Sequence, residues 1–424
     1  MKKFVALLLA LTLCIGLCAC GAQPDAPAAT DAPAAEAPAE ETPAATSETE
    51  TTTASKDIKV GFIFLHDENS TYDLNFINAA KAACAEVGLS DDQVMMKTNI
   101  SESQACYDAA AELVDAGCDL IITGIVGHES FALAAAKEFP EVHFVSCTGV
   151  KAHTEGLSNF HNAFASIYEG RYLAGVAAGL KLNEMIENGD ITAEEAKMGY
   201  VGAFPYAEVK SGYTSFFLGA RSVCPSVTME VTFTSSWYDE ALEKEAANKL
   251  INNGCVLISQ HADSMGAPTA CETAGVPNVS YNGSTVAACP NTFIVSSRID
   301  WTPFFVYAIN CVASGEDIGY DWTGTLATGS VVLTDVNEQA AAAGTVEKIA
   351  EVMKALEDGS VKVFDTATFT VNGETVTTYL ADVDDLGDYV GETEAISDGV
   401  FLESFYRSAP YFDLDIDGIT NLDA

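Results

Sequence analysis

The sequence predicts an α/β protein with two doubly wound lobes, each built on a mostly parallel sheet. Short β-branched runs alternate with stretches of helical periodicity from residue 59 onward, which is typical of βαβ units covered on both faces. This alternation restarts near the middle of the chain. With 424 residues, the chain also exceeds what one compact core usually reaches. We therefore expect two lobes.

A first series of elements predicts the N-terminal lobe. The run KVGFIFL at 59–65 is a continuous apolar strand, and residues 72–87 carry apolar side chains at helical spacing. After the strand VMMKTNI, a Ser-x-x-Gln capping box at Ser101 opens a helix that leads to the strand DLIITG. HESFALAAAKEF and VHFVSCTG repeat the unit once more.

A second series, which predicts the C-terminal lobe, begins with a long helix at 166–187. Helices at 208–223, 239–253 and 267–274 alternate with the strands KMGYVGAF, MEVTFT, VLISQH and NVSYN. Beyond them the pattern predicts a helix at 345–358 and a hairpin turning at Asn372-Gly373.

Three runs fit neither series: LSNFHNAF, FIVSSRID and TGTLATGSVVLTD. Two lobes joined by three crossing strands would need three such runs. We expect residues 58–160 and 293–322 to form the N-terminal lobe, and residues 161–292 and 323–424 to form the C-terminal lobe.

The first 57 residues predict export and attachment to a membrane. Residues 1–20 place two lysines before a short apolar stretch, as a signal peptide does, and end in Leu-Cys-Ala-Cys, which looks like a lipobox with Cys20 as the lipidated residue. An ordinary secretory signal is the alternative. Residues 21–57, rich in Ala, Pro, Thr and Glu, predict a disordered acidic tether. We expect the protein on the extracytoplasmic face of the cell membrane.

The net charge of the chain excludes some classes of binding partner. The chain has 61 acidic and 20 basic residues, a net charge of −41, which argues against nucleic acid and against an anionic membrane surface as partners.

Nine cysteines lie beyond the signal, without a CxxC pair, and several sit in apolar runs. We expect most of them to be small buried hydrophobes, with one or two disulfides left open.

Ligands of doubly wound sheets bind beyond the carboxyl ends of the strands. The predicted loops there are HDENSTYD, GIVGHE, FPYAE, SSWYDE, QHADS and YNGS, which combine aromatic, amide, hydroxyl and acidic side chains. Such loops suit a small polar ring with flat apolar faces, either a sugar or a nucleobase. A phosphorylated ligand is disfavoured, because the chain has neither a GxxxxGK[ST] loop nor a cluster of bases.

The blocks IYEGRYLAGVAAG, GYVGAFPYAEVKSGYTSFFLGARSV, SSWYDEALEKEAA and LISQHADS resemble those of the basic membrane protein family of substrate-binding lipoproteins. The resemblance covers about residues 58 to 365. It implies a type 1 periplasmic-binding-protein fold, a purine nucleoside or free purine base as ligand, and the permease of an ABC importer as partner. We also expect a monomer without cofactor, and no metal site, because the histidines show no HExxH or paired spacing.

The resemblance also implies which residues bind the ligand. They are Tyr72, Asp73 and Asn75 in the first loop, Phe204, Trp237 and Asp239 in the second lobe, His261 and Asp263 in the QHADS block, Asn282 at a strand end, and Trp301. Nucleoside receptors carry a lysine late in the chain, where this sequence has Arg298 and Trp301. A free base therefore stays as open as a nucleoside.

Several of these residues have a structural alternative. Phe204 and Trp237 could be core aromatics, Asp239 could cap a helix, and His261 could orient its loop instead of touching a ligand. For the whole protein, the alternatives are a receptor for another small polar ring that signals without transport, and a hydrolase. An enzyme is disfavoured, because the sequence has no GxSxG and no HExxH motif.

Overall fold

The computed structural model describes residues 58–384 and 390–423. The predicted signal peptide, Cys20 and the tether lie outside the described residues.

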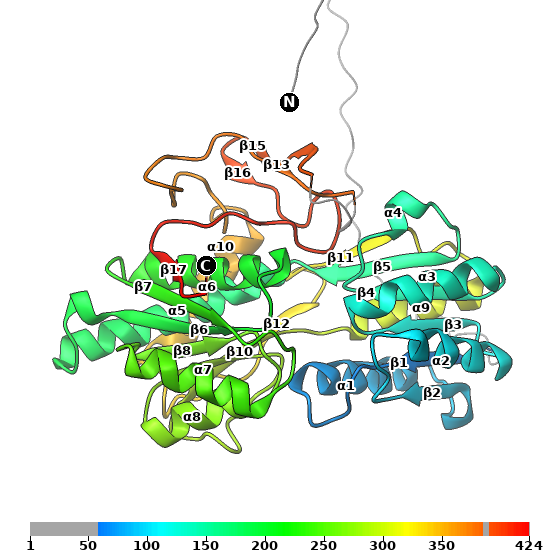
Figure 1. The fold of residues 1–424 in the computed structure, drawn as a ribbon, viewed down its shortest axis with the longest axis horizontal. Helices are drawn as coiled ribbons and strands as arrows, with labels where there is room; N and C mark the ends of the chain where they lie inside the picture. The colour runs from blue at the N-terminus through cyan, green and yellow to red at the C-terminus, as the bar shows by residue number, and fades with distance from the viewer. Residues whose placement is uncertain (1–57, 385–389, 424) are drawn as a thin grey trace, which may run out of the picture. The chain divides into compact units, whose positions relative to one another are not determined.

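The first sheet has six parallel strands in the order β11-β5-β4-β3-β1-β2 (Figure 1). The strands are β1 (Val60–Ile63), β2 (Val94–Lys97), β3 (Leu120–Thr123), β4 (His143–Cys147), β5 (Phe160–Ala165) and β11 (Asp321–Gly324). Helices α1 (Thr71–Glu86) and α9 (Thr302–Ser314) pack on one face, and α2 (Gln104–Asp115) and α3 (Glu129–Glu138) on the other. The short elements are η1 (Asp91–Gln93), η2 (Val126–His128) and α4 (Ala152–Glu155).

The second sheet has seven strands in the order β12-β10-β9-β8-β6-β7-β17, parallel except for the β10–β12 pair. The strands are β6 (Lys197–Gly202), β7 (Thr228–Phe233), β8 (Leu257–Gln260), β9 (Asn278–Tyr281), β10 (Phe293–Ile299), β12 (Val331–Leu333) and β17 (Ile419–Asn421). Helices α5 (Ile167–Asn188), α6 (Ala207–Val223) and α10 (Thr345–Glu357) share one core; α7 (Glu240–Asn252) and α8 (Gly266–Ala274) share the other. The 3-10 turn η3 (Ala193–Glu195) precedes β6.

The chain passes between the sheets three times, after β5, between β10 and α9, and between β11 and β12. These crossings confirm the predicted fold class. The expected lobe boundaries differ from them, however. The strand β5 runs to Ala165 in the first sheet, and β10 belongs entirely to the second sheet, although residues 293–322 were expected in the first lobe. A buried apolar strand carries no sequence mark of the sheet it joins.

Glycines in α5 and α6 explain one of the family-like blocks. A Cβ on Gly175 would lie 2.0 Å from the Phe216 carbonyl oxygen, and one on Gly219 would lie 2.0 Å from that of Tyr172. Only residues without a side chain allow the two backbones to approach this closely. The spacing in LAGVAAG therefore fixes α6, whose first turn reaches the candidate site.

The region after residue 363 differs from the prediction. Asn372 and Gly373 both have positive φ, as a tight turn requires, but a single bridge between Val371 and Glu374 replaces the expected hairpin. Instead, Asp417 accepts hydrogen bonds from Thr370 Oγ1 and Gly373 N, at 2.5 and 2.7 Å. The short strands β13 (Leu380–Ala381), β14 (Thr393–Glu394), β15 (Ile396–Ser397) and β16 (Val400–Phe401) pair locally, and β17 extends the second sheet.

Helix boundaries follow local capping. The predicted capping box at Ser101 is wrong, since Ser103 caps α2 by accepting from Ala105 N. Capping boxes occur instead at Ser90 and Thr192.

All nine cysteines of the described residues are free and buried, as expected for small hydrophobes. No helix in the described part of the chain has the length and apolarity that crossing a membrane requires.

Candidate functional site

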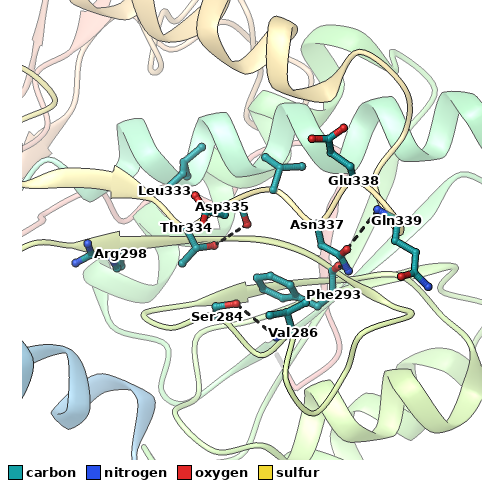
Figure 2. A pocket seen from close by; sticks show the side chains of 11 residues that line it. Ser284, Val286, Phe293, Arg298, Leu333, Thr334, Asp335, Asn337, Glu338 and Gln339 are labelled. Atoms are coloured by element: carbon teal, nitrogen blue, oxygen red, sulfur yellow. Dashed lines mark hydrogen bonds between the residues drawn. The ribbon is translucent and has the colours of Figure 1, made fainter.

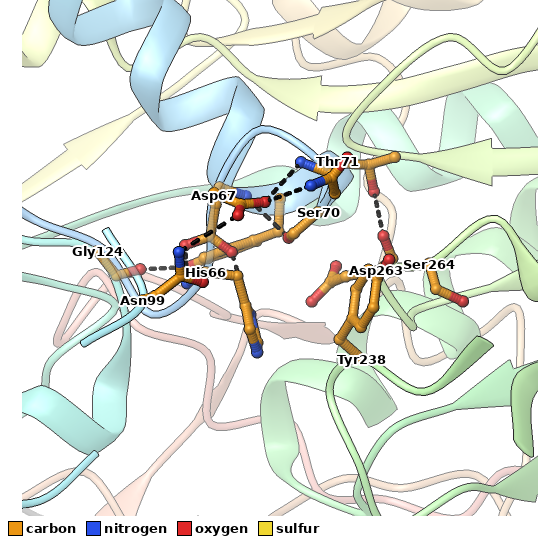
Figure 3. A network of polar contacts seen from close by, with 12 residues as sticks. His66, Asp67, Ser70, Thr71, Asn99, Gly124, Tyr238, Asp263 and Ser264 are labelled. Carbon is orange, nitrogen blue, oxygen red and sulfur yellow. Dashed lines mark hydrogen bonds and ion pairs between the residues drawn. The ribbon is translucent and has the colours of Figure 1, made fainter. Parts of the chain in front are cut away.

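Loops at the carboxyl ends of strands from both sheets meet at one contact (Figure 3). Thr71, at the start of α1, donates from its backbone N and from its Oγ1 to the carbonyl oxygen of Asp263, each at 3.1 Å. Close by, the rings of His66 and Tyr238 lie 5.5 Å apart. The predicted loops after β1, β7 and β8 thus come together across the two lobes.

Polar contacts fix the first-lobe loop internally. Asp67 accepts from Asn69 Nδ2 at 2.8 Å and from Asn99 Nδ2 at 3.3 Å, and its hydrogen bonds, above all that from the backbone of Asn69, lower the pKa of its carboxyl. Asp73 accepts from His66 N at 3.1 Å, and its Oδ2 lies 3.4 Å from His66 Nδ1. Most of the loop's polar atoms are therefore already engaged with one another.

Two predicted residues of α1 donate hydrogen bonds to backbone carbonyls. Tyr72 donates its hydroxyl to the carbonyl of Gly124 at 2.6 Å, and burial raises the pKa of that hydroxyl well above its usual value. Asn75 donates to the carbonyl of Ile299 at 2.6 Å, next to the second crossing. These contacts tie the start of α1 to the first sheet and to the crossing segment.

The second lobe contributes a cluster of three aromatic rings: Phe204, Tyr206 and Trp237. Phe204 stacks on Tyr206 with centroids 5.2 Å apart, and Trp237 meets Phe204 edge-on at 5.1 Å. Phe204 and Trp237 are half-buried and Tyr206 is exposed. These rings retain accessible area at strand ends, and so they provide flat apolar surface for a ligand.

The second lobe also contains a buried charged group. Arg171 is 0% exposed, donates to the Gln260 carbonyl at 3.1 Å and stacks on the ring of Tyr281 at 4.2 Å. His261 lies between Arg171 and Glu208, with its Nδ1 3.5 Å from Arg171 Nη2 and its Nε2 3.4 Å from Glu208 Oε1. Burial lowers the pKa of His261, so the ring is neutral near pH 7.

Asp263 is the most perturbed acid at the contact. Burial raises its pKa well above the usual value, and the charges of Asp73, Glu243 and Glu208 raise it further. Its Oδ1 accepts from Asn282 Nδ2 at 3.4 Å, and Asn282 has a φ of 65° at the end of β9. The acids converge, which disfavours a phosphate or carboxylate on the ligand and favours hydrogen-bond donors.

Two of the predicted residues lie elsewhere. Asp239 is the N-cap of α7 and accepts from Leu242 N at 2.9 Å, which is the structural alternative considered for it. Trp301 is 1% exposed and stacks on Phe76 at 4.5 Å in the first-lobe core. Trp301 offers no surface to a ligand in this conformation, whereas Asp239 is half-buried and its carboxylate caps a helix.

Two cavities border the contact region. One of about 390 Å³ is lined by Thr71, Asn75, Asn282, Arg298 and neighbouring residues, and so includes two predicted residues. A larger one of about 740 Å³ lies along Leu333–Gln339 with Ser284, Val286, Phe293 and Arg298, and includes none of them (Figure 2). The larger cavity shares Ser284, Arg298 and Thr334 with the smaller one but contains none of the predicted ligand residues, so we do not include it in the candidate site.

The sequence reading missed three residues that the structure brings to the contact: Thr71, Arg171 and Glu208. Arg171 is the only base in the block IYEGRYLAGVAAG, which also contains Glu169, and Glu208 follows the strand-end loop FPYA. A basic residue inside a largely apolar block was the available signal, since a buried charge must be compensated. Among the described residues, a group able to hold a cation is Asp382, Asp384 and Glu392, outside this contact.

Comparisons with known proteins give a consistent result. A family model described as ABC transporter substrate-binding protein, PnrA-like, matches residues 63–363. A purine-binding protein of Brucella abortus is 30% identical over 265 residues, which cover 62% of this chain and 71% of that protein. A Haloferax volcanii protein described as a glucose-binding protein of an ABC transporter is 31% identical over 55% of this chain and 56% of its own length. A solved ABC transporter solute-binding protein from Conexibacter woesei has a TM-score of 0.58 at 20% identity, covering 72% and 98%.

Proposed function

The chain belongs to the family of PnrA-like ABC transporter substrate-binding proteins, and we propose that it captures a purine base or nucleoside between its lobes for an ABC importer. The membership confirms the resemblance seen in the sequence. The observation that carries the ligand proposal is the cluster of Phe204, Tyr206 and Trp237 beside acidic hydrogen-bond acceptors. The Brucella abortus relative, named as purine-binding, supports the same ligand class.

The energetics of such a site are adequate. Stacking of a base on an aromatic side chain contributes roughly 1–3 kcal/mol per base. Micromolar affinity requires about −8 kcal/mol in total, so hydrogen bonds to the strand-end loops must supply the remainder. Tyr72, Asp73, Asn75, Phe204, Trp237, His261, Asp263 and Asn282 remain the proposed ligand residues. For Asp239 and Trp301 we now propose structural roles, as a helix cap and a core ring.

Export and anchoring complete the proposal. Cys20 would carry the lipid and residues 21–57 would tether the lobes to the extracytoplasmic face, where a permease can receive the ligand. Cys20→Ser is expected to release the protein from the membrane or leave it unprocessed, as membrane fractionation and mass spectrometry of the N-terminus would show. A mutant that is processed and membrane-bound as before would place the anchor elsewhere.

Mass spectrometry of the compound released on denaturation tests the ligand directly. Calorimetry with adenine, guanine, hypoxanthine and their nucleosides should then show micromolar or tighter binding. Glucose belongs in the same series, because the Haloferax volcanii relative is described as glucose-binding. Heat from glucose alone would replace the purine proposal by a sugar receptor. No heat from any compound, with folded apo protein, would reject both.

A further inference from the structure

The unit formed by Arg171, His261 and Glu208 has a defined direction of hydrogen bonding. A guanidinium only donates, so His261 Nδ1, which lies 3.5 Å from Arg171 Nη2 and 3.4 Å from the Tyr200 hydroxyl, is the accepting nitrogen. The neutral ring then carries its proton on Nε2, which points that N–H toward Glu208 Oε1 at 3.4 Å. The imidazole N–H thus donates to one carboxylate oxygen of Glu208.

The charge of Arg171 ties Glu208 to the same unit. Its Nε and Nη1 have no hydrogen-bond partner among the described residues, and the side chain is fully buried. Glu208 is the carboxylate whose charge offsets that burial. A buried cation destabilises the fold unless an anion compensates it, so Arg171 favours a carboxylate nearby.

A glycine in α6 leaves room for the unit of Arg171, His261 and Glu208. A Cβ on Gly212, one turn after Glu208, would lie 2.9 Å from His261 Nδ1 and 3.4 Å from Arg171 Nε. A glycine inside a helix is destabilising relative to alanine, and here it lets the imidazole pack against α6 one turn after Glu208. The carboxylate is consequently supported from one side, while its side chain remains 18% exposed on the other.

Glu208 lies near titratable groups of both lobes. Its charge acts on Tyr72 of the first lobe and on Asp263 and Tyr281 of the second. Within the described part of the chain, His261 Nε2 is the cationic or imidazole nitrogen found within ion-pair distance of the carboxylate, which leaves the other oxygen for a ligand.

Resting on the proposed function, we propose that Glu208 is a specificity-determining ligand residue that accepts an N–H of a heterocyclic base, and that His261 and Arg171 are positioning residues behind it. A carboxylate held in this way stabilises a ring N–H or an exocyclic amino group and repels a ring nitrogen that only accepts. The ligand class is therefore a base that turns an N–H edge toward α6. Free bases and nucleosides both offer such edges, and they differ at the ring nitrogen that carries the sugar.

The test measures affinity by calorimetry for adenine, guanine, hypoxanthine, adenosine and guanosine in the wild type and in Glu208→Gln. The amide should weaken binding of the recognised base about tenfold or more, because a charge-assisted hydrogen bond is lost. If the ring N–H blocked in nucleosides is the contact, only free bases are affected. If the amino group is the contact, adenine, guanine and their nucleosides are all affected and hypoxanthine is not.

Glu240→Gln is the matched control, since Glu240 is an exposed glutamate in the first turn of α7. It should leave every affinity unchanged. His261→Gln retains an N–H donor toward Glu208 and should bind the base more tightly than His261→Leu, at similar melting temperature. A purely structural histidine would give equal affinities in the two variants.

The outcomes separate this proposal from the proposed function. Purine binding that is the same in the wild type and in Glu208→Gln overturns the role of Glu208 and leaves the purine receptor intact. A wild type that binds no purine rejects the proposed function and this inference with it. A folded Glu208→Gln with selective loss for N–H-bearing bases supports both.

Discussion

The N-terminal lobe reaches the interlobe contact with a loop whose polar groups bind one another, whereas the C-terminal lobe brings open aromatic rings and buried charges. In the first lobe, Asp67 and Asp73 are occupied by Asn69, Asn99 and His66. In the second, Phe204 and Trp237 are only half-buried, and the buried Arg171 lies against the ring of Tyr281 and near the charge of Glu208. In the proposed function, the first lobe would therefore supply a pre-formed platform and the second lobe the stacking surfaces for the ligand.

Removing the buried charge should have the largest effect. Arg171→Ala is expected to cost about 3–5 kcal/mol of unfolding free energy, because it breaks a buried charged unit and leaves a cavity. His66→Ala, in the half-exposed loop of the first lobe, should cost less than about 1 kcal/mol. Denaturant unfolding of both variants measures the contrast. Equal losses would mean that the two halves of the site are equally built into the fold.

Substitution of Trp237 in the second lobe and of Trp301 in the first tests the comparison between the lobes. Trp237→Ala should weaken ligand binding about 10- to 100-fold with little change in melting temperature, since one stacking face is lost. Trp301→Ala should instead cost about 3–5 kcal/mol of stability, because that ring is buried in the first-lobe core. Affinity and melting temperature measured in both variants decide. A destabilised Trp237→Ala with normal affinity would show that this ring, too, is structural.

Acid titration should differ between the lobes. Burial raises the pKa of Glu243 to about 7, and its carboxylate accepts from Ser264 N next to Asp263. The folded state therefore binds this proton more tightly than the unfolded state, and stability should fall as the pH rises from about 4.5 to 7. Asp67 of the first lobe has a lowered pKa and the opposite sign, with stability lost as the pH falls.

The effect of Glu243 is measurable by substitution. Glu243→Gln, which mimics the protonated side chain, should flatten the pH dependence of unfolding by about 1–2 kcal/mol between pH 5 and 7.5. Denaturant unfolding across that range provides the measurement. A pH profile that keeps its wild-type slope would assign the dependence to another buried acid, such as Glu403, whose pKa burial also raises to about 7.

The smallest effect is expected at the contact between the lobes. Thr71→Val removes the Oγ1 hydrogen bond to the Asp263 carbonyl and leaves the backbone hydrogen bond in place. A single neutral hydrogen bond contributes about 0.5–1.5 kcal/mol, so affinity should fall roughly two- to tenfold through faster dissociation. Stopped-flow measurement of ligand release checks this. Unchanged dissociation would indicate that the contact persists without the ligand.

Helices were predictable from the sequence because their signals are local. The predicted helix at 72–87 is found at Thr71–Glu86, and that at 345–358 at Thr345–Glu357, since apolar spacing and caps lie within a few residues of each other. The hairpin at Asn372-Gly373 was wrong in extent, although its turn forms. Asp417, more than forty residues away, accepts from Thr370 Oγ1 and Gly373 N, and its backbone N donates to the Thr370 carbonyl that a longer strand pair would have used.

By itself, the sequence determined the fold class, the two βαβ series, the buried character of the cysteines and the strand-end loops that meet at the site. These features depend on hydrophobic periodicity and on the alternation of strands and helices along the chain, which are local patterns. Tertiary structure alone decided which sheet β10 joins, that Asp239 caps a helix, that Trp301 is core, and that Arg171, His261 and Glu208 form one unit. Burial and pairing of charges depend on segments distant in sequence, and no local pattern encodes which of them will meet.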